Sequence, residues 1–313
     1  MSSAAIMLLA MIIDVAVGWP RALFVRLGHP VTWIGALVST LDRAFNRDDA
    51  SDRTRRMAGA IGAVGVIAIA AIAGWLATWA LPSGWGGVLI AGILAWPLIA
   101  VRSMHDHVEA VARPLGAGNV ETARQAVAMI VGRDPSALDP AGIARAAIES
   151  LAENTADGIV APIFWGVLLG LPGLAAYKAI NTLDSMIGHR TPRYTAFGWA
   201  AARIDDVANF LPSRLTGALF VVVSARPRVA LATMLRYARQ HRSPNAGWPE
   251  AAMAGALDVR LSGPRVYAGR MSDEPWVNGA AADPTLADLT LALGLYRRAM
   301  IVLAAVLTLV ALI

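Results

Sequence analysis

Arg145-Ala-Ala-Ile-Glu149-Ser-Leu-Ala-Glu153-Asn154-Thr-Ala-Asp157-Gly begins the stretch that decides the fold, and an apolar run follows it directly. The stretch continues with two polar motifs, Lys178-Ala-Ile-Asn181-Thr-Leu-Asp184 and His189-Arg190-Thr-Pro-Arg193-Tyr. It closes with Arg203-Ile-Asp205-Asp206-Val-Ala-Asn209-Phe-Leu-Pro-Ser-Arg214. Because charged side chains are costly beside lipid, their recurrence next to apolar segments indicates a functional site.

The composition is that of a membrane protein. The 313 residues are 57% hydrophobic and only 16% charged, with a mean hydropathy of +0.54, whereas soluble domains carry about 25% charged residues. The net charge of +5 is modest and spread over loops, so nucleic acid is not an expected partner. The absence of cysteine excludes disulfides, thiolate metal sites and cysteine nucleophiles.

The arginines predict the topology. Residues 57–81 form an apolar helix long enough to span a bilayer, and residues 88–101 return after a turn at 82–87 that carries no arginine. Seven arginines lie between residue 18 and this helix, and five lie between residues 102 and 157, so the positive-inside rule predicts that residues 18–56 and 102–158 are cytoplasmic. We expect an all-α, multi-pass membrane protein with short or re-entrant helices. Residues 1–313 would form one membrane-embedded domain, with a cytoplasmic helical segment at 102–158, cytoplasmic loops at 188–204 and 240–283, and a cytoplasmic polar face.

Residues 159–187 predict a re-entrant helical hairpin. The apolar arms on either side of Leu171-Pro172-Gly173 are each too short to cross a bilayer. A hairpin that dips in from the cytoplasm would bring Asn154 and Asp157 near Lys178, Asn181 and Asp184. A full crossing remains the alternative.

Capping residues predict where helices begin. Asp139-Pro140 should start a helix on which Glu149, Glu153 and Asp157 share one face, at positions i, i+4 and i+8. Asp283-Pro284 should cap the last helix, and residues 260–270 should form a hairpin or an extended loop. The sequence His105-Asp106-His107 suggests a metal site, but its histidines are two residues apart and point to different helix faces, so a solvated helix end is favoured.

The polar residues fit a substrate that bears phosphate. Carboxylates without cysteine favour Mg²⁺, which accepts one or two carboxylates together with substrate phosphates. Arginines can bind phosphate through two parallel hydrogen bonds, and Lys178, the single lysine beside 26 arginines, suggests a place where a compact ammonium is needed. Chance survival of one lysine, and simple pairing of acids with bases at helix ends, are the structural alternatives. Neither a P-loop nor a dinucleotide-binding glycine motif is present in the sequence.

Several long motifs resemble one family. They are Gly-His-Pro-Val-Thr-Trp-Ile-Gly (28–35), Glu-Ser-Leu-Ala-Glu-Asn-Thr-Ala-Asp-Gly (149–158), Lys-Ala-Ile-Asn-Thr-Leu-Asp-Ser-Met-Ile-Gly (178–188), Asp-Asp-Val-Ala-Asn-Phe-Leu-Pro-Ser-Arg (205–214) and Ser-Pro-Asn-Ala-Gly-Trp-Pro-Glu (243–250). In this order they are similar to the adenosylcobinamide-phosphate synthase family of cobalamin biosynthesis (the CbiB/CobD type). The resemblance runs over nearly the whole chain.

The resemblance implies an inner-membrane ligase. It would join a propionate carboxylate of adenosylcobyric acid to (R)-1-aminopropan-2-ol or its phosphate, with ATP as co-substrate and Mg²⁺ as cofactor. Its partners would be the corrinoid, the amine phosphate and membrane lipid, with a homo-oligomer or a complex with other cobalamin-assembly enzymes left open.

Residue type suggests individual roles within this reaction. We assign catalysis to Glu149, Glu153, Asp157, Lys178 and Asp184, and metal binding to Glu153, Asp157 and Asp184. The residues assigned to substrate binding are Asn154, Asn181, His189, Arg190, Arg193, Arg203, Asp205, Asp206, Asn209, Arg214, Arg242 and Asn245.

Two other classes of function remain as alternatives. Half-length helices with buried polar groups also mark transport sites, although the sequence shows no inverted repeat. A non-catalytic membrane sensor or scaffold is the third class.

Overall fold

The computed structural model describes residues 2–132, 134–267, 270–272 and 274–313. The chain is mainly helical and divides into two compact units. Unit 1 comprises residues 1–100, 161–209 and 307–313, and unit 2 comprises residues 101–160 and 210–306.

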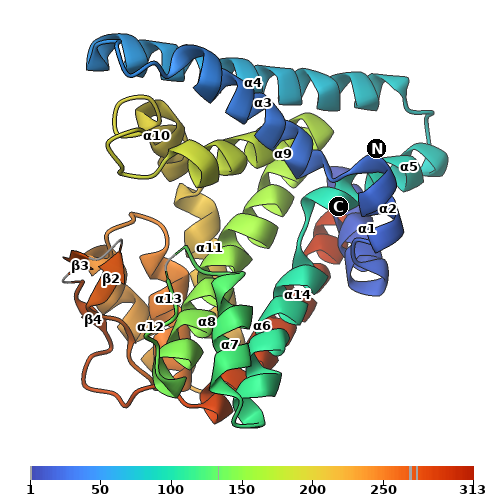
Figure 1. The fold of residues 1–313 in the computed structure, drawn as a ribbon. Helices are drawn as coiled ribbons and strands as arrows, with labels where there is room; N and C mark the ends of the chain where they lie inside the picture. Colours follow the sequence, from blue (N-terminus) through green and yellow to red (C-terminus); the bar gives the residue numbers. More distant parts are fainter. Residues whose placement is uncertain (1, 133, 268–269, 273) are drawn as a thin grey trace. The chain divides into compact units, whose positions relative to one another are not determined.

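Unit 1 is entirely helical within the described residues (Figure 1). Its elements are α1 (Ser3–Val17), α2 (Arg21–Leu27), α3 (Pro30–Phe45), α4 (Asp52–Ala80), α5 (Trp85–Ala95), the short 3-10 helix η1 (Trp96–Leu98), α9 (Ala161–Ile187) and α10 (Trp199–Ala208).

Local capping explains where these helices begin. His29 is the N-cap of α3, where its Nδ1 accepts a hydrogen bond from the Val31 amide at 3.2 Å, so it is the turn residue that its place beside Pro30 suggests. Ser51 caps α4 by accepting a hydrogen bond from the Thr54 amide at 3.2 Å. The helix predicted over 57–81 is confirmed, but it begins five residues earlier, at Asp52. The Ser51 cap allows the charged residues 52–56 to form the first helical turn.

Helix α9 is broken at Gly170, which adopts φ 68° and ψ −155°. A backbone with positive φ suits glycine, and Pro172 follows within two residues, so the helix ends and restarts there. Figure 1 shows the two arms of α9 running in different directions. The predicted break is therefore confirmed, one residue ahead of Leu171-Pro172-Gly173.

The second arm of α9 (residues 171–187) runs antiparallel along α4. At its start, the carbonyl oxygen of Leu171 lies 2.6 Å from where a Cβ on Gly74 would be. Toward its end, Ala179 and Leu183 share a buried cluster with Ala63 of α4. Only glycine at position 74 permits this approach. Gly74 lies 17 residues after Met57, which is about 26 Å along α4. The bend of α9 therefore packs against α4 about 26 Å from the start of its apolar part.

Unit 2 combines helices with two small antiparallel ladders (Figure 1). Its elements are α6 (Val101–Gly116), α7 (Val120–Ala128), α8 (Pro140–Thr155), the π-helical turn η2 (Ala156–Val160), α11 (Phe210–Val223), α12 (Pro227–Tyr237), η3 (Ala238–Gln240), α13 (Gly247–Leu257), β1 (Leu261–Ser262), β2 (Arg265–Tyr267), β3 (Arg270–Ser272), β4 (Trp276–Val277) and most of α14 (Leu286–Leu312). Strand β1 pairs with β4, and β2 pairs with β3. A hairpin is therefore present, but it joins 265–267 to 270–272, whereas residues 261–262 pair with 276–277, so the bounds predicted over 260–270 are wrong.

Asp139 caps α8 as predicted, with its Oδ1 accepting a hydrogen bond from the Gly142 amide at 2.7 Å. The prediction that Asp283 caps the last helix is wrong. Thr285 and Asp288 cap that helix through reciprocal hydrogen bonds, including Thr285 N to Asp288 Oδ2 at 2.8 Å. Asp283 instead binds Arg145 and Arg260, and forms two hydrogen bonds of 2.8 and 2.6 Å with the latter.

Five helical segments are long and apolar enough to cross a membrane, and a sixth is formed if the bent pair α10–α11 counts as one span. They are Arg21–Phe45, Asp52–Ala80, Trp85–Gly116, Pro140–Ile187 and Leu286–Leu312. Large apolar side chains on α4 face outward, such as Ile61 (72% exposed) and Trp79 (76% exposed), as expected for contact with lipid. The predicted all-α multi-pass fold with broken helices is confirmed, and the cytoplasmic orientation of its polar face stays a prediction.

Candidate functional site

The polar motifs of unit 1 meet around the C-terminal end of α9. Asp184 lies one turn before that end, and the charges of His189 and Asp206 act on it. Asp206 on α10 is also within the electrostatic reach of Arg190 and forms a 2.9 Å ion pair with Arg203. The structure thus brings together five of the predicted site residues, from α9, the following loop and α10.

Gly188 makes this arrangement possible. Its amide donates to the carbonyl oxygen of Asp184 at 2.8 Å, and a Cβ on Gly188 would overlap the Asp184 carboxylate. A side chain at position 188 would therefore push Asp184 out of place, so the glycine is a positioning residue for that carboxylate.

Lys178 lies two turns before the end of α9 and is only 8% exposed. Its charge acts on His29, the cap of α3, so the motif at 28–35 and the motif at 178–188 come together in unit 1. Asn181 lies between Lys178 and Asp184 on the same helix and is half-buried. Lys178 is therefore a buried lysine close to a second ionisable group, and its catalytic role stays a prediction.

A hydrogen-bond chain joins α10 to α9 within unit 1. The Asn209 side chain donates to Asp205 Oδ2 at 3.0 Å, and its carbonyl oxygen accepts from the Tyr177 hydroxyl at 2.8 Å. Trp165 adds an indole bond to the carbonyl oxygen of Ala208 at 3.1 Å. These contacts hold the Asp205-Asp206 motif against α9, so Asp205 and Asn209 support the position of Asp206.

Arg193 belongs to a different network from Arg190. Its guanidinium binds Asp42 at 2.8 Å, an interaction that raises the pKa of Arg193. Its carbonyl oxygen accepts hydrogen bonds from Asn46 and Arg55, and Asn46 also binds Asp42 at 2.7 Å. These contacts favour a structural role for Arg193. Sequence reasoning missed Asp42, Asn46 and Arg55, because their contacts with Arg193 span 138 to 151 positions along the chain and no local pattern indicates them.

The three acids predicted to share one face of α8 have different environments in unit 2. Glu149 is 5% exposed and accepts a hydrogen bond from the Ser262 amide of β1 at 2.7 Å, whereas Glu153 is exposed. Asn154 binds back to Ser150, at 2.9 Å to its carbonyl oxygen and 3.1 Å to its hydroxyl. The contact with Ser262 favours a structural contribution from Glu149.

Asp157 and Gly158 lie in the π-helical turn η2. A π-turn widens the helix and changes the face that its residues present, and such turns often occur at functional sites. The prediction that Glu149, Glu153 and Asp157 share one face assumed a continuous α-helix. The π-turn changes the face on which Asp157 lies. Sequence spacing alone gives no signal for this turn.

Arg214 and Asn245 come together in unit 2. The guanidinium of Arg214 donates to Asn245 Oδ1 at 3.4 Å and lies over the rings of Phe210 (3.6 Å) and Trp248 (4.5 Å). Two motifs that are 30 residues apart, 205–214 and 243–250, thus form one aromatic cage around an arginine. Arg242 lies apart from this cage, with its Nη1 3.7 Å from Glu274.

His105 groups with Asp106 and Glu109 on α6, and one ligand atom from each lies within 4.8 Å of the others. The two carboxylates also pair with arginines on the same helix, Arg102 at 3.4 Å and Arg113 at 3.0 Å. His107 faces elsewhere and contacts the carbonyl oxygen of Ser103, which confirms that the two histidines do not share a face. Because its acids are already paired, this group carries no assignment.

The predicted site residues therefore form two sets, each within one unit. Unit 1 gathers Asp184, His189, Arg190, Arg203 and Asp206, with Lys178 beside His29. Unit 2 gathers Arg214 with Asn245 and presents Glu153 and Asp157 on consecutive helical turns. The convergence of Asp157 with Lys178 and Asp184 stays a prediction.

These features define the class: a multi-pass helical membrane protein with charged residues grouped at the ends of its apolar helices. The sequence model of the family described as "CobD/Cbib protein" matches residues 7–296. The chain belongs to this CobD/CbiB family.

Curated relatives support the same membership. The chain is 61% identical over 311 residues to the cobalamin biosynthesis protein CobD of Rhodobacter capsulatus, covering 99% of this chain and 98% of the relative. It is 46% identical to the proteins of that name from a Sinorhizobium species, covering 88% and 87% of the two chains, and from Brucella suis, covering 86% and 85%. No solved structure matches the chain.

Proposed function

We propose that this protein acts in cobalamin biosynthesis as an amide-forming ligase. It would join a propionate carboxylate of adenosylcobyric acid to (R)-1-aminopropan-2-ol or its phosphate and yield adenosylcobinamide or its phosphate. The family match over residues 7–296, with a relative named for cobalamin biosynthesis at 61% identity, is the observation that carries the proposal. The inner membrane and an active face toward the cytoplasm, where ATP is available, belong to the same proposal.

The group at the end of α9 supports ATP-dependent chemistry. A carboxylate must be activated before an amine can displace it, and transfer of a phosphoryl group from ATP is one route. Arg190 and Arg203 would bind phosphate oxygens, and Lys178 would supply a compact positive charge close by. Fixed positive groups of this kind stabilise the charge that develops on a transferred phosphoryl group.

Asp184 and Asp206 are chemically suited to hold Mg²⁺. They are two hard oxygen donors whose negative charges act on each other, and Mg²⁺ binds through one or two carboxylates together with substrate phosphates. When bound, the metal would neutralise phosphate charge. Glu153 and Asp157 are the donors that unit 2 offers for the same purpose, and either could accept the proton of the attacking amine.

The informative experiment is a reconstituted assay. Purified protein in lipid vesicles is supplied with adenosylcobyric acid, aminopropanol phosphate, ATP and Mg²⁺, and the amide product is followed by mass spectrometry. We expect product that depends on ATP and on the divalent cation. Omission of each component in turn shows which the reaction needs, and replacing the amine phosphate with the free amine shows which form is the substrate.

Failure to form product in complete mixtures would overturn the ligase assignment. Movement of the corrinoid across the vesicle membrane without product would support a transporter instead. Product formation that is unaffected by both Asp184→Asn and Glu153→Gln would retain the reaction and reject this site.

A further inference from the structure

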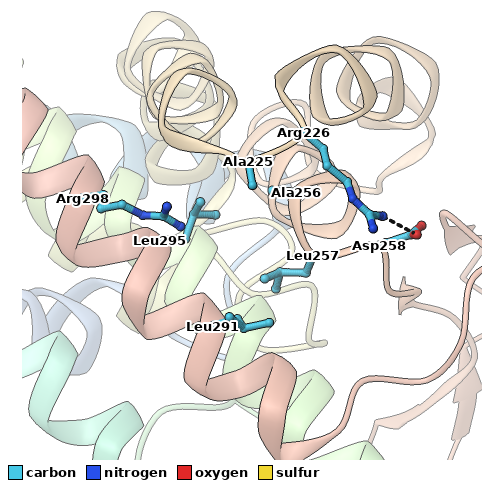
Figure 2. Close-up of a pocket in the computed structure, with 8 residues that line it drawn as sticks. All are labelled: Ala225, Arg226, Ala256, Leu257, Asp258, Leu291, Leu295 and Arg298. Atoms are coloured by element: carbon cyan, nitrogen blue, oxygen red, sulfur yellow. Dashed lines mark hydrogen bonds and ion pairs between the residues drawn. The ribbon is translucent and has the colours of Figure 1, made fainter.

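A pocket of about 410 Å³ lies within unit 2, and its lining includes none of the predicted site residues. Arg226, Asp258 and Arg298 supply its charged groups, and Leu257, Leu291 and Leu295 form much of its apolar lining. In Figure 2, Arg298 reaches inward beside Leu295, while Arg226 points to Asp258 at the other side of the pocket. The pocket therefore combines an apolar floor with charges at two sides.

The charges of the pocket favour an anion. Two arginines and one aspartate give a formal charge of +1 (2 − 1). Arg226 is paired with Asp258 at 2.8 Å, but Arg298 forms no salt bridge with any of the residues that the structure describes. A ligand with one negative charge would neutralise the pocket and give Arg298 a partner.

Asp258 is placed by the backbone. It is the C-cap of α13 and adopts the left-handed conformation, with φ 59° and ψ 43°, while its amide binds the carbonyl oxygen of Ala254. Aspartate and asparagine tolerate this conformation better than most residues. The carboxylate is therefore held at the pocket by the end of the helix, and asparagine can replace it without backbone strain.

Both arginines lie at the boundary between an apolar helical segment and a polar segment of the chain. Arg298 immediately precedes residues 299–312 of α14, which carry no charged side chain, and Arg226 follows α11 after Val223. The run after Arg298 is about 21 Å long and belongs to the candidate span Leu286–Leu312. The uncharged residues 215–223 before Arg226 are about 14 Å long and belong to the bent pair α10–α11. Arginines at such positions lie at the level of lipid headgroups, where basic pockets between helices bind anionic lipids.

We propose that this pocket binds the phosphate of an anionic glycerophospholipid. Arg298 and Arg226 hold the phosphate oxygens, Asp258 accepts a hydrogen bond from a headgroup hydroxyl, and Leu257, Leu291 and Leu295 contact the glycerol and the first acyl carbons. The net charge of the pocket selects a headgroup of charge −1, such as phosphatidylglycerol, over zwitterionic phosphatidylcholine. This inference is independent of the proposed ligase activity.

The test is native mass spectrometry of the full-length protein in detergent, titrated with phosphatidylglycerol or phosphatidylcholine. We expect one phosphatidylglycerol to bind about tenfold more tightly than phosphatidylcholine, because the choline cation cancels the negative charge of the headgroup and offers no hydroxyl to Asp258. A tenfold difference corresponds to about 1.4 kcal/mol. Arg298→Gln should remove about tenfold of that affinity, and Arg298→Lys should restore part of it. Asp258→Asn, which removes the negative charge, should tighten binding severalfold.

Arg297→Gln is the matched control, because Arg297 is exposed at the same end of the apolar run but does not line the pocket. It should change the affinity less than about twofold, while thermal unfolding shows that both variants are folded. Equal losses in Arg297→Gln and Arg298→Gln would reduce the effect to general surface charge and overturn the proposal. Equal retention of phosphatidylcholine, or displacement of the lipid by equimolar free glycerol phosphate, would overturn it as well.

Discussion

Asp184 in unit 1 and Asp283 in unit 2 are carboxylates beside cationic side chains, but their surroundings differ. Asp283 is held by Arg145 and Arg260, and both guanidiniums lie over the ring of Trp276, at 4.7 and 4.5 Å. Asp184 has a second carboxylate, Asp206, within electrostatic reach. Burial and a like charge nearby both disfavour an ionised carboxylate, whereas a nearby cation such as His189 favours it. The contrast separates a structural ion-pair clamp from a candidate site.

The sharpest way to break this contrast is to neutralise each carboxylate in turn. Asp184→Asn should lower kcat/KM for amide formation by about 100-fold or more, the scale on which a group that contacts the reacting centre acts. Asp283→Asn should leave the activity of the folded protein within about twofold, because Asp283 lies in the clamp. The assay is product formation per folded protein, and similar activity in the two variants would contradict the distinction.

The position of Asp184 depends on the second arm of α9, which is anchored at Gly74. Gly74→Ala should lower the free energy of unfolding by about 1–3 kcal/mol, because a methyl group would strike the backbone of Leu171 and Pro172. Gly65→Ala on the same helix is the control, since no atom of the described residues lies within 4 Å of its added Cβ. Thermal unfolding in one detergent measures both variants, and equal melting temperatures would contradict the close contact.

The clamp should show itself in the pH dependence of stability. The hydrogen bond from Arg260 holds the pKa of Asp283 below its ordinary value of 3.8. A lowered pKa stabilises the folded state above the ordinary value, and this stabilisation is lost as the pH falls through the folded value. Asp283→Asn should therefore cost about 1–2 kcal/mol near neutral pH, after allowance for partial exposure.

The difference in melting temperature between wild type and Asp283→Asn should stay constant from about pH 5 to pH 8 and shrink below about pH 4. Asp49, paired with Arg47 on the exposed surface at 3.1 Å, is the control residue. Asp49→Asn should change the melting temperature little, because exposed ion pairs contribute weakly. A constant difference down to about pH 3 would reject the clamp as the source of the effect.

Lys178→Arg should have the smallest effect on activity. The positive charge remains, but a planar guanidinium replaces a compact ammonium at a position that is 8% exposed. We expect kcat/KM to fall roughly fivefold, equivalent to about 1 kcal/mol, with the melting temperature reported alongside. Unchanged activity would show that the single lysine has no special role.

Much of the fold follows from local patterns. The cap at Asp139, the long apolar helix α4 and the break beside Pro172 depend on residues within a few positions of one another, so the sequence predicts them. The extension of α4 to Asp52 and the capping of α14 by Thr285 were missed, because charged turns and competing caps leave more than one start available. The sequence also does not distinguish Gly74, where an added Cβ would meet the backbone of Leu171, from Gly65, where no described atom lies within 4 Å.

The candidate site was only partly predictable. Charged motifs beside apolar helices identified Asp184, Asp206 and the neighbouring arginines, since such residues are costly in a membrane. Sequence reasoning treated Arg190 and Arg193 alike, yet Arg193 pairs with Asp42, 151 residues away. Contacts across that separation depend on how helices pack, which no local pattern records.

The amino-acid sequence by itself determined that the chain is a helical membrane protein, where most helices begin, and which family its motifs resemble. Only the tertiary structure decided which charges are neutralised by partners, as in the Asp283 clamp, and which lie beside like charges, as Asp184 does. The physical reason is the separation along the chain over which each effect acts. Helix formation and burial in lipid depend on neighbouring residues, whereas the electrostatic environment of a carboxylate depends on groups that folding brings from distant parts of the chain.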